Sequence, residues 1–340
     1  MDKAKAELTR QPISIRSLKN EENWLPNKPA ARVLKGHRSA VNAVSFHPSY
    51  SILASASDDA TARIWDFDSG QSEKILRGHT RSVNDIDFSP DGTLFVTASS
   101  DLTLRIWDSS SCNTIKTLRG HENTVSSGKF CKPKGDRIVS ASRDGSIRIW
   151  DVEQGYCLHT IYLGSDWVRC VIADGDIMVS GGHDREVKMF HGTELKHEFR
   201  GHDHVIECVV FAPPSSNRYL AGVSGQPKLK DSEKTLYFAS SSRDKTIKLW
   251  SMKTGLIGTL VGHDNWVRAV VFHPEGRFLL SASDDLSIRC WDLSEPSFPC
   301  VRVLERAHNQ FISCLCWGNG RILASGDMDR EINIWAPIES

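Results

Sequence analysis

Histidine, aspartate and serine, which together can form a hydrolytic triad, recur at regular intervals along this chain of 340 residues. Six histidines stand near the head of a repeating unit: His37, His79, His121, His202, His263 and His308. Seven aspartates stand later in the units: Asp59, Asp101, Asp144, Asp184, Asp244, Asp285 and Asp329. A catalytic site needs one preorganised set of groups, whereas this His–Asp pair occurs in six of seven units. We therefore interpret these residues as a buried structural network, completed by a strand serine and a tryptophan N–H.

Other signs of catalysis, of a metal or of a cofactor are weak in the sequence. No nucleophile elbow surrounds a serine, and no glycine-rich phosphate loop precedes a helical segment. The nine cysteines show no CxxC pair and no Cys/His spacing typical of zinc, so we expect reduced, mostly buried thiols. We predict no catalytic residue, no metal and no cofactor.

An aromatic residue follows each of the seven aspartates after six positions: Trp65, Trp107, Trp150, Phe190, Trp250, Trp291 and Trp335. Successive aromatics are 42, 43, 40, 60, 41 and 44 residues apart, and one insertion explains the longest interval. A period of 40–45 residues with Gly-His near the start and Trp-Asp near the end is typical of WD repeats. We predict an all-β, seven-bladed WD-repeat propeller in which each blade is a small four-stranded sheet.

The chain ends indicate how the ring closes. Too few residues follow Trp335 for a fourth strand, while ARVLKGH at 31–37 is similar to the outer strand and Gly-His of other units. We expect Ala31–Leu34 to complete the last blade, which removes open sheet edges. This divides the chain into a polar tail and linker at 1–27, with the end of a helix at 2–9, and a propeller at 28–340.

Two units depart from the pattern. The fourth has Gly164-Ser165 in place of Gly-His and Phe190 in place of tryptophan, and we expect it to be the least well tied blade. The fifth carries a Ser-, Pro-, Gly- and Lys-rich insertion at 212–235, between its first and second strands. We expect this insertion to be mobile and to contain no helix.

The charge balance limits the partners. Lys plus Arg equals Asp plus Glu at 42 each, so no net field favours nucleic acid or an anionic membrane. No run of about 18 apolar residues exists, and the start MDKAKAELTR lacks a signal core. We expect an intracellular protein, in which any electrostatic recognition of a partner depends on local clusters of charge.

The His–Asp contact brings the loop before each blade and the turn before its tryptophan strand to one face of the ring. Basic residues precede the key aspartate in units three and five, as Arg143 and Arg243, and we expect both side chains to project into solvent. The segments SDWVR and HDNWVR add Trp167, Arg169, Trp266 and Arg268 to this face. Trp and Arg are enriched at binding hot spots, which favours a partner site over tryptophans that only pack on the next blade.

Several strings resemble one family. SASRDGSIRIWDVEQGYC (140–157), LGSDWVRCV (163–171), SSRDKTIKLW (241–250) and VGHDNWVRAVVFHPEGRF (261–278) are similar to the lissencephaly or nuclear-distribution proteins, WD-repeat regulators of cytoplasmic dynein. The resemblance covers about residues 20–340 and includes NWLPNKPAARVLKGH at the start.

The resemblance implies contacts with two parts of the dynein heavy chain motor domain. The family's contacts on the motor ring correspond to Arg143, Arg169, Arg243 and Trp266, and a further lysine contact falls on Leu286. Its acidic stalk contacts correspond to Asp136 and Asp174. The implied function is non-catalytic regulation of dynein-dependent microtubule transport, nuclear positioning and cell division, in the cytoplasm, on the cytoskeleton and at the centrosome or spindle pole.

Alternatives remain open at this point. The family also implies nuclear-distribution coiled-coil proteins and the catalytic subunits of a platelet-activating-factor acetylhydrolase as partners. A generic adaptor, such as a substrate receptor of a ubiquitin ligase, belongs to a different functional class, and a propeller enzyme is a third hypothesis. The family's N-terminal LisH motif and coiled coil are not in this sequence, so self-association is not expected.

Overall fold

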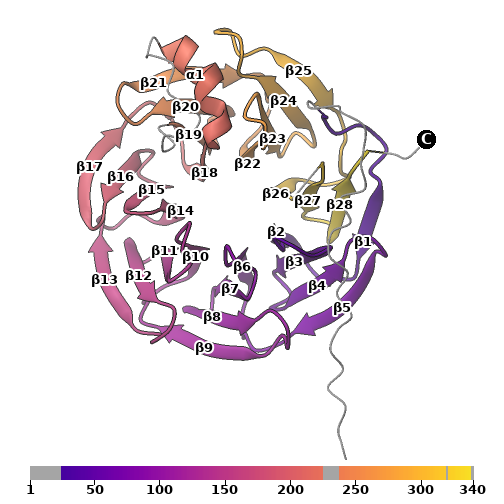
Figure 1. Ribbon diagram of the computed structural model, residues 1–340, viewed down its shortest axis with the longest axis vertical. Coiled ribbons are helices and arrows are strands. Elements are labelled where there is room, and N and C mark those ends of the chain that lie inside the picture. The colour runs from indigo at the N-terminus through magenta and orange to yellow at the C-terminus, as the bar shows by residue number, and fades with distance from the viewer. Residues whose placement is uncertain (1–23, 225–236, 319–320, 338–340) are drawn as a thin grey trace, which may run out of the picture.

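The computed structural model describes residues 24–224, 237–318 and 321–337. Their strands form seven antiparallel sheets of four strands, which stand side by side around a central axis (Figure 1). The predicted seven-bladed, all-β propeller is confirmed.

The strands follow one another from the centre outward in six of the blades. Blades one to three contain β2 (Val41–Phe46), β3 (Ile52–Ser57), β4 (Ala62–Asp66) and β5 (Gln71–Leu76), then β6 (Val83–Phe88), β7 (Leu94–Ser99), β8 (Thr103–Asp108) and β9 (Thr114–Arg119), then β10 (Val125–Phe130), β11 (Arg137–Ser142), β12 (Ser146–Asp151) and β13 (Cys157–Tyr162). Blades four to six contain β14 (Val168–Asp174), β15 (Ile177–Gly182), β16 (Val187–His191) and β17 (Glu194–Phe199), then β18 (Ile206–Phe211), β19 (Tyr237–Ser242), β20 (Thr246–Ser251) and β21 (Gly255–Val261), then β22 (Val267–Phe272), β23 (Phe278–Ser283), β24 (Ile288–Asp292) and β25 (Cys300–Leu304).

Blade seven combines the two ends of the described chain. It contains β26 (Ile312–Trp317), β27 (Leu323–Asp327) and β28 (Glu331–Trp335), and its outer strand is β1 (Arg32–Lys35). Strand β1 lies beside β28 (Figure 1), and in this antiparallel pair Arg32 lies opposite Ile334 and Lys35 opposite Glu331. The predicted closing strand is therefore confirmed, shifted by one residue.

Burial explains why the blades must stand next to one another. The second strand of a regular blade, such as β3 (ILASAS) or β23 (FLLSAS), is buried along its whole length because neighbouring sheets cover both of its faces. Ala54 of blade one and Ile86 and Trp107 of blade two, for example, share one core cluster. The outer strand β5 is exposed except at its last residue.

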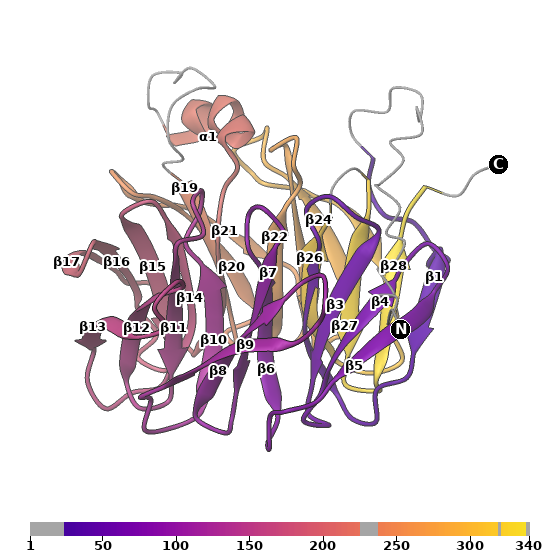
Figure 2. The same cartoon turned by 60° about the horizontal axis from the view of Figure 1, so that its bottom comes forward.

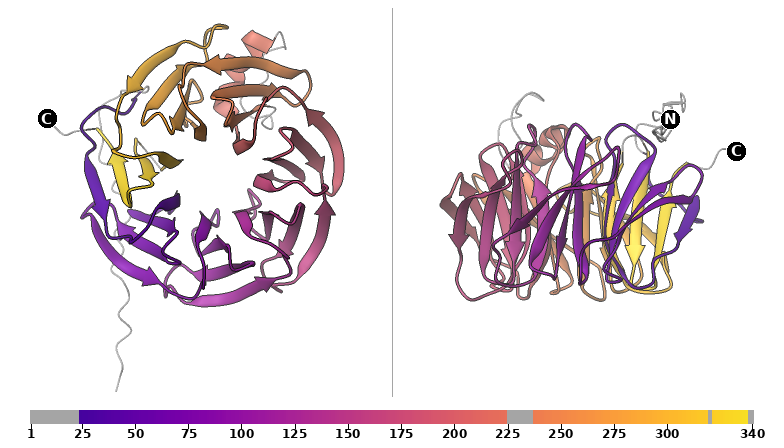
Figure 3. Two further views of the ribbon diagram at one scale, coloured as in Figure 1. Left: turned by 180° about the vertical axis from the view of Figure 1, so that it is seen from behind. Right: turned by 90° about the horizontal axis from the view of Figure 1, so that it is seen from below.

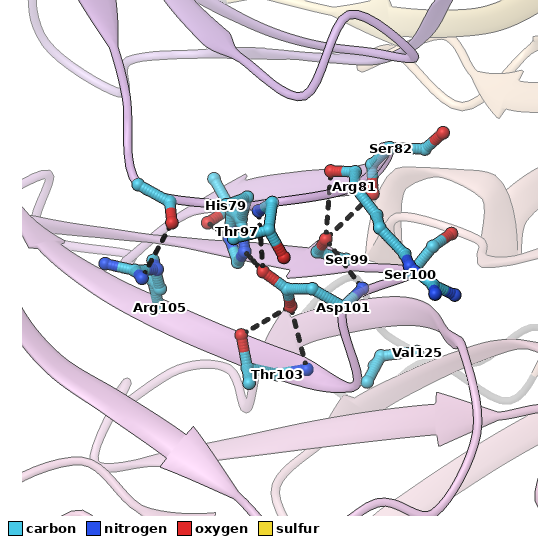
Figure 4. Close-up of polar contacts among 12 residues, drawn as sticks. His79, Arg81, Ser82, Thr97, Ser99, Ser100, Asp101, Thr103, Arg105 and Val125 are labelled. Atoms are coloured by element: carbon cyan, nitrogen blue, oxygen red, sulfur yellow. Dashed lines mark hydrogen bonds and ion pairs between the residues drawn. The ribbon is translucent and has the colours of Figure 1, made fainter.

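The predicted His–Asp network is present in five blades. In blade two, His79 Nδ1 lies 2.8 Å from Asp101 Oδ2, and His79 Nε2 lies 2.7 Å from the Thr97 hydroxyl (Figure 4). Trp107 donates its indole N–H to the same hydroxyl over 2.9 Å. The same contact joins the other pairs: His37 with Asp59, His121 with Asp144, His202 with Asp244, and His263 with Asp285. Burial alone would raise the pKa of these aspartates, but the hydrogen bond to histidine and its companions hold it below the ordinary value.

Blade seven uses a different aspartate from the one that the spacing predicted. His308 Nδ1 lies 2.8 Å from Asp327 Oδ2, whereas Asp329 is exposed, so the prediction for Asp329 was wrong. Asp327 stands where blade six has Ser283, whose hydroxyl accepts the N–H of Asp285. The Asp327 carboxylate replaces both the usual aspartate and this serine. One oxygen contacts His308, and the other accepts the N–H of Asp329 over 2.9 Å.

Blade four lacks the histidine network, and the prediction that Asp184 belongs to it was wrong. Asp184 instead forms an ion pair with Lys188 on the next strand. A Cβ at Gly262 of blade six would meet Arg289 Nη1 at 2.9 Å and Trp291 at 3.0 Å, whereas a Cβ at Gly164 would meet nothing within 4 Å. The entry to blade four thus lacks the close arginine and tryptophan contacts that Gly262 makes in blade six.

The insertion of blade five contains helix, contrary to expectation. A 3-10 turn at Pro214–Ser216 continues into α1 (Asn217–Ser224), with Leu220 buried in the core of blades five and six. Ser215 donates its hydroxyl hydrogen to the Pro274 carbonyl over 2.7 Å, which fastens the turn to blade six. The remainder of the predicted insertion, 225–235, lies outside the described residues, as does the helix end predicted at 2–9.

Trp24 and Leu25, expected in a linker, are buried against blades six and seven. Trp24 packs edge-on against Trp317 with ring centroids 5.8 Å apart. The Trp24 carbonyl lies 3.2 Å from His273 Nε2, and burial lowers the pKa of His273 to about 4. These contacts anchor the segment that leads into β1.

Candidate functional site: the rim of blades three to six

The two faces of the disc carry different loops, because the strands of each blade alternate in direction. We call the rim face the one formed by the segments before each innermost strand and by the turns between second and third strands. The opposite face carries the loops between first and second strands, among them α1 (Figures 2 and 3). Backbone hydrogen bonds of 2.9 Å from His183 to Trp167 and from Asp284 to Trp266 join the two kinds of segment on the rim face.

Glu207 lies at the centre of the predicted site, although the sequence analysis did not identify it. Its side chain is only 4% exposed, and it contacts three arginines from three different blades. Arg169 Nη2 lies 2.5 Å from Glu207 Oε2, Arg243 Nε donates to Oε1, and Arg268 Nη1 lies 3.7 Å from Oε1. Burial would raise the pKa of Glu207, but Arg169, Arg243 and Arg268 outweigh it and lower the pKa.

Trp266 contacts two of these arginines. Arg243 lies over its ring at 4.3 Å from the centroid, and Arg268 at 4.8 Å. Arg268 is fixed in turn by Asp284, which accepts two hydrogen bonds of 2.9 Å from its Nε and Nη2. We call Trp266, Arg243, Arg268, Glu207 and Asp284 the Trp266 cluster.

A second tryptophan stands on the blade-four side of the rim. Arg143 lies 4.6 Å from the centroid of Trp167, and the His183 ring lies 4.7 Å from it. Among the described residues, the buried Nε of Arg143 and Nε2 of His183 have no hydrogen-bond partner. Burial, with Arg169 and Arg243 nearby, lowers the pKa of Arg143. We call Trp167, Arg143 and His183 the Trp167 cluster.

The expectation that Arg143 and Arg243 project freely into solvent was wrong. Arg243 is ion-paired to a buried carboxylate, and Arg143 is laid over an indole ring. Arg143, Arg169, Glu207 and Arg268 nevertheless line a common central cavity of about 330 Å³, and Arg243 is joined to them by its ion pair with Glu207. The structure thus brings together all six residues predicted for this surface.

The two acidic residues predicted for a second contact lie on the opposite face. Asp136 is exposed in the β10–β11 loop, and Asp174 ends β14 in the neighbouring blade. The loops are joined, because Gly175 donates its N–H to the Lys132 carbonyl over 2.6 Å. The two residues therefore lie on joined loops, which also carry Lys132 and Lys134. We call the two carboxylates the acidic edge, which is separate from the Trp266 and Trp167 clusters.

No group of three or more His, Cys, Asp or Glu side chains suited to a metal ion occurs within 24–224, 237–318 and 321–337. The nine cysteines are free thiols, and burial raises the pKa of Cys131, Cys290 and Cys314 to about 12. Over the same part of the chain, none of the helices has the length and apolarity needed to cross a membrane.

Fold and repeats together define a WD-repeat propeller. The WD domain, G-beta repeat family matches the chain in seven segments: 29–66, 70–108, 112–151, 155–191, 193–251, 254–292 and 298–336. Each segment begins just before the outer strand of one blade, and ends at the third strand of the next blade or one residue after it.

Comparison with curated relatives identifies a more specific family within the WD-repeat proteins. The nuclear distribution protein PAC1 of Coccidioides posadasii is 46% identical over 337 residues, which cover 94% of this chain and 71% of that protein. The nuclear distribution protein nudF of Aspergillus terreus is 44% identical over 322 residues, covering 92% and 72%, and nudF of Emericella nidulans is 44% identical over 323 residues, with the same coverage. The chain belongs to the nuclear distribution protein family, which confirms the resemblance and the predicted non-enzymatic scaffold class.

Proposed function

We propose that the protein is a non-catalytic regulator of cytoplasmic dynein and that its rim face binds the dynein motor domain. The observation that carries the proposal is the Trp266 cluster, in which an indole and two arginines are already fixed in a partly exposed position. Fixed aromatic and arginine side chains lose little entropy on binding, which makes them effective anchors. The choice of dynein as the partner rests on the family. The relatives that the chain matches are nuclear distribution proteins, and the family resemblance implies contacts with the dynein motor domain.

The acidic edge of Asp136 and Asp174 provides a second surface for the same partner. Because it lies on the opposite face, one propeller can contact two separate parts of a large motor at once, the ring through the rim face and the stalk through the acidic edge. In a cell, the protein is then expected in the cytoplasm and at the centrosome or spindle pole.

The direct test is the affinity of this chain for a purified dynein motor domain, with and without changes at the rim. Arg143→Glu combined with Arg243→Gln removes attraction, while the glutamine can still hydrogen-bond Glu207. Loss of an interface charge pair costs about 2–5 kcal/mol, so binding at micromolar protein should disappear.

The matched control is Lys74→Glu combined with Arg119→Gln, which makes the same change in net charge on the exposed outer strands β5 and β9. The control should bind as the unmodified protein does. Equal affinity of the rim variant and the unmodified protein, with both folded, would place the motor site elsewhere; no binding by any of them would reject dynein as the partner.

A further inference from the structure

One position repeats in every blade and has an unusual occupant in three of them. The second residue of each innermost strand lies at the same level of the ring: Asn42, Asn84, Ser126, Arg169, Glu207, Arg268 and Ser313. In blades one and two this residue ties its strand to the next, since Asn42 donates to the Val83 carbonyl over 2.9 Å and Asn84 to the Val125 carbonyl over 2.7 Å. Blades four, five and six instead carry an Arg–Glu–Arg sequence around the ring.

We propose that Glu207 is the positioning residue of the rim site: it sets the places of Arg169, Arg243 and Arg268 without contacting the partner itself. The proposal deepens the proposed function and rests on it. With 4% of its side chain exposed, Glu207 is nearly out of reach of a partner, whereas the three arginine side chains are 22%, 18% and 15% exposed. The partner would touch the cations, and the carboxylate would hold them.

Electrostatics explains why the arginines need this carboxylate. Three guanidinium groups that are mostly removed from water repel one another, and each loses hydration. Glu207 lies among them, with one oxygen on Arg169 and the other on Arg243 and Arg268. Without its charge, Arg169 and Arg243 gain by turning toward water, whereas Arg268 keeps Asp284.

Trp266 links the positions of these arginines to the surface that the partner contacts. Its ring is covered by Arg243, which Glu207 holds directly, and by Arg268, which Glu207 and Asp284 share. A shift of Arg243 therefore removes one of the two cations from the ring and changes the surface that the partner meets. A plain inter-blade tie, like Asn42 or Asn84, would affect only folding.

The experiment compares Glu207→Gln and Glu207→Asp in the full chain with Asp292→Asn. Asp292 is a matched control because it is also a buried carboxylate paired to an arginine, Arg277, with an Nη2–Oδ2 distance of 2.6 Å. It ends β24 on the face opposite the rim. Three quantities are measured: thermal unfolding, the side-chain Nε–H resonances of the arginines, and affinity for the dynein motor domain.

Glu207→Gln should lower motor affinity at least tenfold and shift the Nε–H resonances of Arg169 and Arg243 most. Glu207→Asp keeps the charge but shortens its reach by one methylene, so its affinity should fall between those of Glu207→Gln and the unmodified protein. Asp292→Asn should lower the melting temperature without changing affinity or these resonances. In an Arg243→Gln background, Glu207→Gln should cost clearly less affinity, because its effect passes through that arginine.

Unchanged or tighter binding by folded Glu207→Gln would overturn the proposal, as would an equal loss of affinity in Asp292→Asn. If Glu207→Gln does not fold, two comparisons replace it. One is Glu207→Asp against the unmodified protein, and the other is the Glu207→Gln/Arg243→Gln double variant against Arg243→Gln alone. Motor affinity is judged in both as described above. If the unmodified protein does not bind the motor domain, the proposed function fails by itself. The arginine resonances then still test the positioning role: a joint shift supports it, and no shift overturns it.

Discussion

Two tryptophans stand on the same face of this propeller, yet they are held in different ways. Trp266, on the side of blades five and six, contacts two arginines that are themselves ion-paired to Glu207 and Asp284. The side chain of Trp167, on the side of blades three and four, contacts Arg143 through a cation–π contact and His183 through a tilted ring contact, and 39% of Trp167 is exposed. The side chains of one cluster are fixed by charge pairs and those of the other by ring contacts.

The difference extends into the blades beneath. Blade five has the complete network, with His202 bonded to Asp244 and to Ser240. Blade four has no such histidine, and its turn aspartate pairs with Lys188. A rim cluster on a well-tied blade can present a preorganised surface, while one on a loosely tied blade must be ordered when the partner binds. We expect the two sides to contribute unequally to stability and to binding.

The largest difference should come from charge reversal. Arg243→Glu places a second carboxylate beside the buried Glu207 and should cost about 3–5 kcal/mol of unfolding free energy. Arg143→Glu breaks no ion pair with any residue that the structure describes and loses a cation–π contact, so it should cost about 1 kcal/mol or less. Urea unfolding of both variants measures the contrast, and equal losses would remove the distinction between the clusters.

The tryptophans should differ in binding. Trp266→Ala should weaken motor affinity by about 2 kcal/mol or more, since a preordered aromatic anchor contributes most of its contact energy to binding. Trp167→Ala should cost less than half as much, because part of its contact energy offsets ordering of Arg143. Calorimetric titration against the motor domain compares them; a larger loss for Trp167→Ala would reverse the assignment of the anchor.

The networks beneath the clusters should differ in stability. Asp244→Ala leaves His202 and the turn N–H groups without a carboxylate and should cost roughly 1–3 kcal/mol. Asp184→Ala removes a partly exposed ion pair, which typically contributes under about 1 kcal/mol. Melting experiments on the pair test the comparison, and a cost for Asp184→Ala that matched Asp244→Ala would show that blade four is as well tied as blade five.

The sequence predicted features that repeat and missed features that occur once. The number of blades, the ring closure and five His–Asp pairs could be predicted from the spacing, because every blade buries its faces against its neighbours with the same pattern of residues. Asp327 was missed because a carboxylate two residues before the expected turn position can reach His308 equally well.

Glu207 does not occur at the same position of any other blade, so no repeat marks it. The only signal was one charge within the apolar strand HVIECVVF. Its three arginine partners come from three blades, which no local pattern reveals. Helix α1 was missed because the composition of 212–235 as a whole obscured the apolar residues of NRYLAGVS.

The smallest expected effect is a gain. Leu286 occupies the turn after Asp285, on the side of the Trp266 cluster, where the family resemblance implies a lysine. Its backbone has φ 69°, and Lys245 takes the same turn position of blade five with φ 70°, so Leu286→Lys should fold without new strain. A charge at the edge of an interface acts mainly on the association rate and contributes about 0.2–1 kcal/mol. Leu102→Lys is the matched control, since Leu102 has φ 72° at the same position of blade two, away from the cluster.

Stopped-flow association with the motor domain at low and physiological salt separates the two lysines. Leu286→Lys should associate faster than the unmodified protein at low salt, and the advantage should shrink as salt screens the charge. Leu102→Lys should show no advantage at either salt concentration. If both lysines accelerate association equally, the gain reflects net charge rather than position, and the blade-six edge of the rim lies outside the contact. If only Leu286→Lys does so, the contact extends from the Trp266 cluster across the turn of blade six.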